Sequence, residues 1–139
     1  MAFDPEVQLP PFTVILFPYR FENATISKIF VVLCHERGYA FCIKTTANLA
    51  FYQNSPGLLS GCIPYKRGEL GLFAEDTVIQ PDNQFPISHA SLIEASERGA
   101  LRVLGTMPAD FKEKLIRAIN SSVLMDSRKK ERILRRIPK

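Results

Sequence analysis

The segment KIFVVLCHERGYAFCIKT, residues 28–45, is the clearest guide to the architecture of this chain. Residues 28–34 are almost all apolar, as in a strand that is buried on both faces of a sheet. The HERG sequence then turns the chain, because Gly38 can adopt the left-handed backbone conformation that tight turns often need. Residues 39–45 follow with side chains that alternate between two faces. We therefore predict two neighbouring strands joined by a tight turn.

The same pattern extends on both sides of this segment. FTVILF (residues 12–17) predicts an earlier strand that ends at Pro18, with a polar hairpin loop over residues 19–27. Residues 46–60 read as an irregular connection or one short helix, and GCIPY and LGLFA read as a hairpin around KRGE. DTVIQ and FPISH follow as strands on either side of a Pro-Asp-Asn turn. Five or six short strands about ten residues apart predict a small barrel or roll.

The hydrophobic period then changes to that of helices. SLIEASERG predicts about two helical turns ended by Gly99, and ALRVLG predicts a strand. TMPADFKEKLIRAINSSV predicts a helix with Thr106 as its N-cap and Pro108 in its first turn. After a break near residues 120–122, a last helix is expected over MDSRKKERILRRI. The apolar faces of these two helices are predicted to hold Phe111, Leu115, Ala118, Ile119, Ile133, Leu134 and Ile137.

The composition is that of one globular domain over residues 1–139. The chain is 46% hydrophobic and 23% charged, which excludes disordered and fibrous classes and is enough for a core without disulfides. Cys34, Cys42 and Cys62 show no CxxC spacing, so we expect buried thiols in a reducing compartment. The start lacks the features of a signal peptide, and no apolar run approaches the roughly 20 residues of a membrane span. These features predict a cytoplasmic protein without a membrane segment.

The charge is concentrated in the C-terminal part. Residues 112–139 hold ten Lys and Arg against three Asp and Glu, a net of +7, so the total of +4 leaves −3 for residues 1–111. A basic helix of this kind can contact nucleic acid phosphates. It can equally be a solvated face or a helix that docks on a partner. The sequence leaves these interpretations open.

Two adjacent acids raise a similar choice. The stretch LFAEDTVIQPDNQFPISH, residues 72–89, places Glu75 and Asp76 inside an apolar, strand-like run. Adjacent acids can protect a sheet edge from pairing with another chain. They can also line a functional site, and the pattern alone favours neither interpretation.

The order of these elements resembles the PemK/MazF family of toxin-like ribonucleases. The likeness is carried by VILFPYRF in the first strand, IKTT at the end of the third, GLFAEDTVI, and the late helix LGTMPADFKEKL. It implies an α+β fold, with a small SH3-like antiparallel β-barrel over about residues 12–105 and C-terminal helices packed outside it over about residues 106–139. It also implies a homodimer that cuts single-stranded RNA without a metal or cofactor and is inhibited by an antitoxin protein.

The resemblance also implies the site residues. The basic residue that opens the family's second strand falls on Lys28. The Thr-Ser pair that ends the third strand falls on Thr45 and Thr46, and the acidic residue falls on Asp76. Some members have a basic residue two positions before that acid, and Ala74 stands there in this chain.

Metal-free RNA cleavage needs a base for the ribose 2′-OH, an acid for the leaving 5′-oxygen, and donors or positive charge at the phosphate. Asp76 is the candidate base. Lys28 supplies charge, and the hydroxyls of Thr45 and Thr46 can hydrogen-bond phosphate oxygens. Further RNA contacts are predicted from cations and from rings that can stack on unpaired bases: Arg20, Lys44, Tyr19 and Tyr52.

Ordinary structural roles exist for the same residue types. Hydroxyls at strand ends often cap turns, surface lysines are usually solvated, and loop aromatics commonly close the ends of barrels. His35 and His89 are expected to be structural or surface residues, and their separation shows no metal-site spacing. A second hypothesis is therefore a catalytically inactive barrel that binds nucleic acid or a protein partner through its basic C-terminal helices. A structural protein of unrelated activity is a third.

Overall fold

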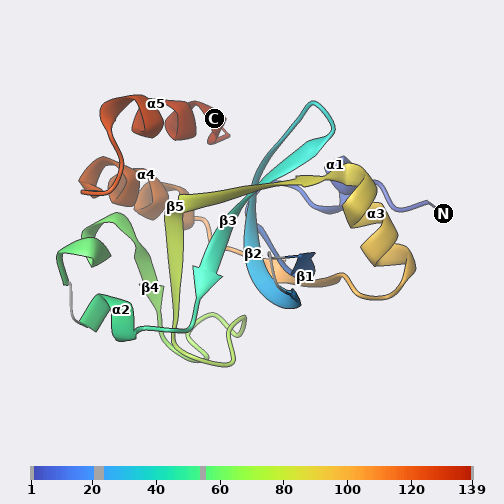
Figure 1. The fold of residues 1–139 in the computed structure, drawn as a ribbon, viewed down its shortest axis with the longest axis horizontal. Helices are drawn as coiled ribbons and strands as arrows, with labels where there is room; N and C mark the ends of the chain where they lie inside the picture. The colour runs from blue at the N-terminus through green and yellow to red at the C-terminus, as the bar shows by residue number, and fades with distance from the viewer. Residues whose placement is uncertain (1, 21–23, 54–55, 139) are drawn as a thin grey trace.

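The computed structural model describes residues 2–20, 24–53 and 56–138, and its centre is a curled antiparallel sheet (Figure 1). The sheet consists of β1 (Thr13–Arg20), β2 (Thr25–Glu36), β3 (Tyr39–Thr46), β4 (Ile63–Tyr65), β5 (Thr77–Ser88) and β6 (Arg102–Thr106), in the order β4-β5-β3-β2-β1-β6. Within the described ranges no pairing joins β4 to β6, so the sheet curls without closing. The helices are α1 (Pro5–Gln8), α2 (Ala50–Gln53), the 3-10 helix η1 (Pro56–Gly61), α3 (His89–Glu97), α4 (Phe111–Ser121) and α5 (Ser127–Arg136). The predicted α+β class is confirmed.

The β2–β3 hairpin forms where the sequence predicts it. Arg37 and Gly38 take positive φ angles of 51° and 82° at the turn, which is the backbone that two-residue hairpin turns need. The side chains of β3 alternate as expected. Ile43 belongs to the core on one face of the sheet, and Ala40 and Cys42 belong to the core on the other.

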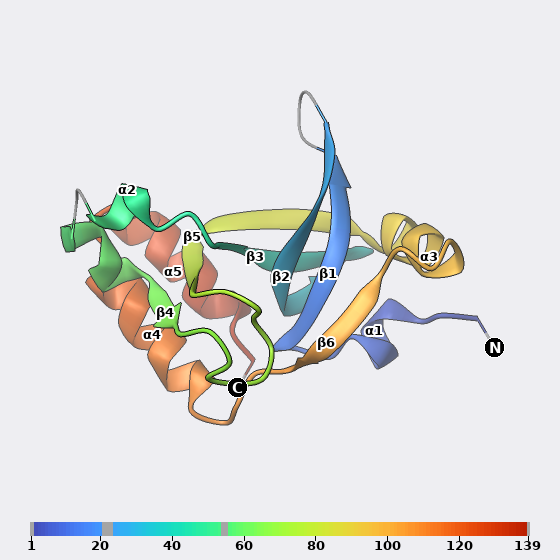
Figure 2. The same ribbon diagram turned by 90° about the horizontal axis from the view of Figure 1, so that it is seen from below.

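The β1–β2 hairpin is longer than predicted (Figure 2). β1 passes through Pro18 to Arg20 and β2 begins at Thr25, so much of the predicted polar loop is strand; residues 21–23 lie outside the described part. β6 pairs with β1 only over residues 13–16. Beyond this range the outer side of β1 is a sheet edge, where proline is tolerated. Pro18 therefore does not end the strand.

β5 is one long strand where the sequence predicted two strands and a turn. Gln80 pairs with Lys44 of β3, and Gln84 pairs with Ile43, which directly precedes Lys44. Residues 81–83 therefore have no partner in β3 and form a bulge. The predicted Pro-Asp-Asn turn is wrong, because β3 continues alongside β5 on both sides of these residues.

The predicted hairpin of GCIPY with LGLFA is also wrong. β4 pairs with the start of β5, where Tyr65 lies opposite Thr77. Residues 66–76 form an irregular connection, and Phe73 anchors it in the core. Glu75 and Asp76 belong to this connection, so they precede the strand and do not interrupt it.

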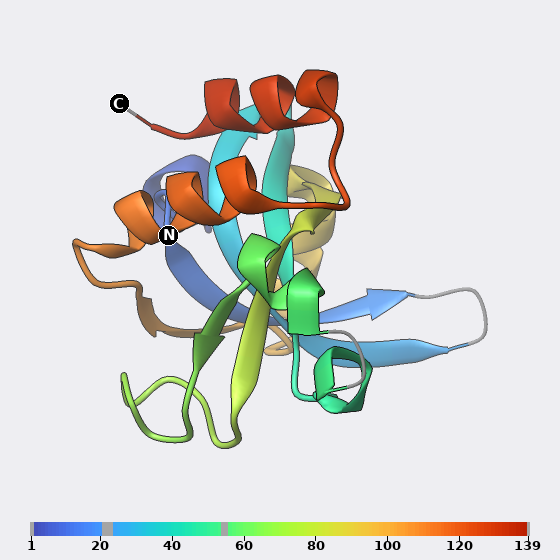
Figure 3. The same cartoon turned by 90° about the vertical axis from the view of Figure 1, so that its left-hand side faces the viewer.

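Helices cover both faces of the sheet, with α4 and α5 side by side on one face (Figures 1 and 3). α1 and α3 share a second core cluster with the opposite face, which includes Leu9 and Leu92. The predicted apolar faces are confirmed, since Leu134 is partly buried against the core and the fully buried side chains include Phe111, Leu115, Ala118, Ile119, Ile133 and Ile137. Thr106 is not the N-cap of α4. It ends β6, and α4 begins after Asp110.

Candidate active site

A hollow of about 370 Å³ lies where β1, β2, the end of β3 and the start of β5 meet, and we call it the hydroxyl pocket. Its polar wall is formed by Ser27, Lys28, Thr45, Thr46, Glu75 and Thr77, and its apolar wall by Leu16, Ile29, Ala47 and Ala74. Lys28, Thr45 and Thr46 were predicted as catalytic from separate stretches of sequence. The structure brings all three to this hollow.

Strand register explains the convergence. Thr45 and Thr46 lie opposite Ile79 and Val78 at the beginning of β5. Glu75 lies two residues before the first residue of that strand, so the antiparallel pairing carries the acidic connection to the end of β3. On the other side, β2 pairs with β3, where Phe30 lies opposite Lys44, and this register brings Lys28 to the level of the end of β3.

The two threonines have different hydrogen bonds. Thr45 is buried, and its hydroxyl donates to the Ile29 carbonyl oxygen at 2.9 Å, so its proton is already used within the sheet. The hydroxyl of Thr46 accepts from the Asn48 N–H at 3.1 Å and keeps its own proton for another acceptor. Thr46 is therefore the donor for a ligand, and Thr45 has a mainly structural role.

The carboxylate of the pocket is Glu75 and not the predicted Asp76. Asp76 does not line the pocket, and its Oδ1 accepts from the Arg67 backbone N–H at 2.7 Å. The hydroxyl of Thr77 donates to the Glu75 carbonyl oxygen at 2.9 Å and holds that backbone in place. Sequence reasoning missed Glu75 as the site carboxylate, although its position next to Asp76 was the available signal.

Lys28 is half-buried, and within the described ranges it makes no hydrogen bond or ion pair. Its ammonium group is thus available to an anion in the hollow. Lys44, predicted as an RNA contact, lies opposite Phe30 of β2 and Gln80 of β5 and does not line the pocket. The two lysines therefore offer a matched pair for experiments.

Arg20 and Tyr19 lie away from the hydroxyl pocket. They line a separate groove of about 690 Å³ that runs between the β1–β2 hairpin and α3. The ring of Tyr19 contacts those of Phe30 and Phe85, with centroids 5.8 Å and 5.1 Å away, so much of it is used in packing. The predicted RNA contacts are therefore divided between two sites.

Tyr52, the remaining predicted RNA contact, is buried behind the pocket with 4% of its surface exposed. Its hydroxyl accepts from Gln80 Nε2 at 2.6 Å and from the Cys62 thiol at 3.5 Å. Burial raises the pKa of Tyr52 well above its usual range. As placed, this ring offers no face to a base, and its hydroxyl stays protonated near neutral pH.

The thiols do not support a cysteine nucleophile. Burial raises the pKa of Cys42 and Cys62. Burial and the neighbouring Glu36 carboxylate raise the pKa of Cys34 as well. Since the thiolate is the reactive form, the polar groups of the hydroxyl pocket remain the better candidates for chemistry.

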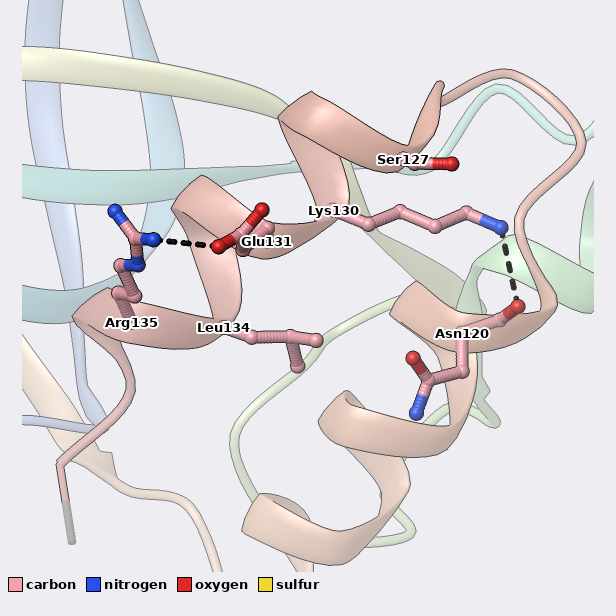
Figure 4. Close-up of a pocket in the computed structure, with 6 residues that line it drawn as sticks. All are labelled: Asn120, Ser127, Lys130, Glu131, Leu134 and Arg135. Atoms are coloured by element: carbon pink, nitrogen blue, oxygen red, sulfur yellow. Dashed lines mark hydrogen bonds and ion pairs between the residues drawn. The ribbon is translucent and has the colours of Figure 1, made fainter.

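Another hollow, of about 460 Å³, lies between α4 and α5 (Figure 4). Lys130 Nζ donates to the Asn120 carbonyl oxygen of α4 at 3.1 Å, and Arg135 pairs with Glu131 one turn away on α5 itself. Lys130 thereby caps a carbonyl group in the last turn of α4, a common role for lysine. These contacts identify the hollow as a seam between two helices.

No protein-family model matches the chain, and a comparison with curated proteins finds none that matches it. None of the described helices combines the length and apolar character needed to cross a membrane. Within the described ranges, no three His, Cys, Asp or Glu side chains are grouped as metal ligands.

Proposed function

We propose that this protein is a metal-independent endoribonuclease of the PemK/MazF type that cleaves single-stranded RNA in the hydroxyl pocket. The convergence of Lys28, Thr46 and Glu75 on one hollow is the observation that supports this function most strongly. A cation, a hydroxyl with a free proton and a carboxylate are suited to binding a phosphate and removing a ribose proton.

In the proposed reaction Glu75 accepts the proton of the ribose 2′-OH. The 2′-oxygen attacks the neighbouring phosphorus, the bond from phosphorus to the 5′-oxygen breaks, and the products are a 2′,3′-cyclic phosphate and a 5′-OH. Lys28 stabilises the negative charge that builds on the phosphate. It is also the one Lys or Arg side chain among the pocket-lining residues, so in this proposal it protonates the leaving oxygen.

The finer features of the family belong to the same proposal. These are an SH3-like barrel with helices outside it, a homodimer, inhibition by an antitoxin protein and a cytoplasmic location. The curled antiparallel sheet supports the first of them. With Ala74 lining the pocket in place of a cation, the proposed reaction relies on Lys28 alone for positive charge.

The test uses the full chain and an end-labelled, random-sequence RNA library in the presence of EDTA. We expect cleavage by the wild type, with 2′,3′-cyclic phosphate ends. Glu75→Gln should lower the rate by about 10² to 10⁴, the usual contribution of an acid–base group, and Thr46→Val should also lower it. Asp76→Asn is the matched control and should stay within a few-fold of the wild type.

Circular dichroism and thermal unfolding establish that each variant is folded. Absence of cleavage by the wild type contradicts the proposed function. Cleavage that depends on Asp76 and is indifferent to Glu75 contradicts the assignment of the base.

A further inference from the structure

Two histidine side chains that lie 54 residues apart in the sequence form a hydrogen bond with each other. His35 Nδ1 of β2 and His89 Nε2, from the first residue of α3, are 2.9 Å apart, and their ring centroids are 5.0 Å apart. His35 Nε2 lies 2.6 Å from the Leu9 carbonyl oxygen, just after α1. The pair therefore connects α1, β2 and α3, which meet in the second core cluster.

The geometry limits the number of protons that the pair can hold. Because a carbonyl oxygen only accepts, His35 Nε2 must carry a proton. The contact between His35 Nδ1 and His89 Nε2 then has room for one shared proton. The pair keeps this bond when it is neutral and when it has one positive charge. With two positive charges both facing nitrogens carry protons, and the bond cannot exist.

The surroundings oppose the second charge. Arg132, Arg135 and Arg136 of α5 line the same hollow as His35, and the acidic group there, Glu36, is paired with Arg136 at 3.5 Å. Cys34 of β2 also lines it. The N-terminus of α3, where His89 lies, carries the positive end of the helix dipole.

α1 contributes only the Leu9 carbonyl group to the pair. Its acids are exposed, and the carboxylate of Asp4 accepts from the Glu6 N–H as the cap of its own helix. Gly38, in the turn just before β3, accepts a hydrogen bond through its carbonyl oxygen from the His89 backbone N–H at 2.9 Å. No carboxylate from α1 is therefore bonded to either ring.

We propose that His35 and His89 form an acid-sensitive clamp that holds α1 and the start of α3 against β2 and releases them when both rings become charged. Histidine side chains generally change their charge between about pH 5 and 8. We therefore expect the clamp to release under mildly acidic conditions. Because the clamped pair has room for only one added proton and the released rings have room for two, the stability of the clamp falls as the pH falls. This inference is independent of the proposed ribonuclease function.

Hydrogen exchange of the full chain at about pH 7.5 and about pH 5, corrected for intrinsic rates, tests the clamp. We expect amide protection in α1 and at the start of α3 to fall about two- to tenfold in acid, the effect of losing one hydrogen bond. His89→Gln is the key control. Its amide can donate to neutral His35 and accept from charged His35, so its protection should stay constant. His89→Ala should show low protection at both pH values.

An equal acid-induced loss in the wild type and His89→Gln overturns the proposal, as does a loss that is uniform over α1, β2 and β3. A second measurement covers the case in which His89→Gln fails to fold. Imidazole nitrogen NMR of the wild type should show the two rings titrating in separate steps. Simultaneous titration of both rings, with unchanged α1 protection, also overturns the clamp.

Discussion

Helix α5 carries six Lys and Arg side chains, whereas the hydroxyl pocket has Lys28 alone. Most cations of α5 are already bonded within the fold. Those with partners are Lys129, Lys130, Arg135 and Arg136. Lys28 makes no hydrogen bond or ion pair within the described ranges. The comparison teaches that helix α5 uses most of its cations for contacts within the fold, whereas the single cation of the hydroxyl pocket has no partner among the described residues and faces a hollow.

The bulge in β5 explains why α5 needs charged contacts. Residues 81–83 have no partner in β3, so their backbone groups need other partners. Lys129 Nζ donates to the Asp82 carbonyl oxygen in this bulge at 3.0 Å. At the other end of α5, Arg136 lies over the Phe41 ring at 3.8 Å from its centroid. The charges thus orient a helix whose apolar stripe is narrow.

The largest effect that we expect from these substitutions is on RNA cleavage, when the cation of the hydroxyl pocket is removed. Lys28→Met keeps the length of the side chain and removes its charge. We expect RNA cleavage to fall about 10²- to 10³-fold, as when one group that stabilises a transition-state charge is lost. Lys44→Met removes a charge outside the pocket and should change the rate less than about threefold. The measurement is the initial rate of RNA cleavage in EDTA.

Equal losses in the two lysine variants would show that general positive charge, and not a group in the pocket, drives cleavage. Thermal unfolding of both variants serves as the control for folding. A normal rate in Lys28→Met would remove the cation from the proposed mechanism.

The second prediction tests whether the charged contacts of α5 stabilise the fold. Arg136 pairs with Glu36, donates to Gln84 Oε1 at 3.3 Å and stacks on Phe41. Arg136→Ala should lower the free energy of unfolding by about 1 to 2 kcal/mol, because a shielded cation–π contact and an ion pair are lost together. Urea denaturation measures this loss.

Arg132→Ala is the matched control for this prediction. Arg132 is exposed and makes no hydrogen bond or ion pair in the part of the chain that the structure describes. Its removal should change the unfolding free energy by less than about 0.5 kcal/mol. Equal effects of the two substitutions would contradict the stabilising role of these contacts.

The same comparison shows how far sequence patterns reach. Apolar periodicity predicted the buried face of α4 and the alternation along β3, because both follow from local geometry. It failed at residues 81–83, where Pro-Asp-Asn has the local chemistry of a turn. There the continuing partner strand β3 decides the conformation, and a local pattern contains no information about that strand.

The candidate site was also predicted only in part from the sequence. Lys28, Thr45 and Thr46 were predicted from the family resemblance, and the structure brings all three to one hollow. The choice between Glu75 and Asp76 was missed because both lie in the irregular connection before β5, where tertiary contacts such as the bond from the Arg67 N–H to Asp76 Oδ1 decide which side each acid faces. The bond of His35 to His89 was missed for the related reason that it depends on tertiary packing alone.

The smallest expected effect concerns RNA affinity, whose dependence on salt distinguishes binding at α5 from binding at the hydroxyl pocket. Arg128 and Arg132 are the α5 cations without a hydrogen bond or ion pair among the described residues. We expect the double variant Arg128→Gln/Arg132→Gln to change single-stranded RNA affinity less than about threefold, because the proposed site does not include α5. Fluorescence anisotropy over a salt series measures this, in a Glu75→Gln background that leaves the RNA intact.

The slope of the salt series gives the sharper readout. Each phosphate contact on a single strand contributes about 0.7 to the slope of log affinity against log salt concentration. If RNA lay along α5, loss of two contacts would reduce the slope by about 1.4, which is twice 0.7. An unchanged slope is expected if Lys28 and the pocket hold the RNA. A reduction of that size would instead favour a binding module that uses its basic C-terminal helix.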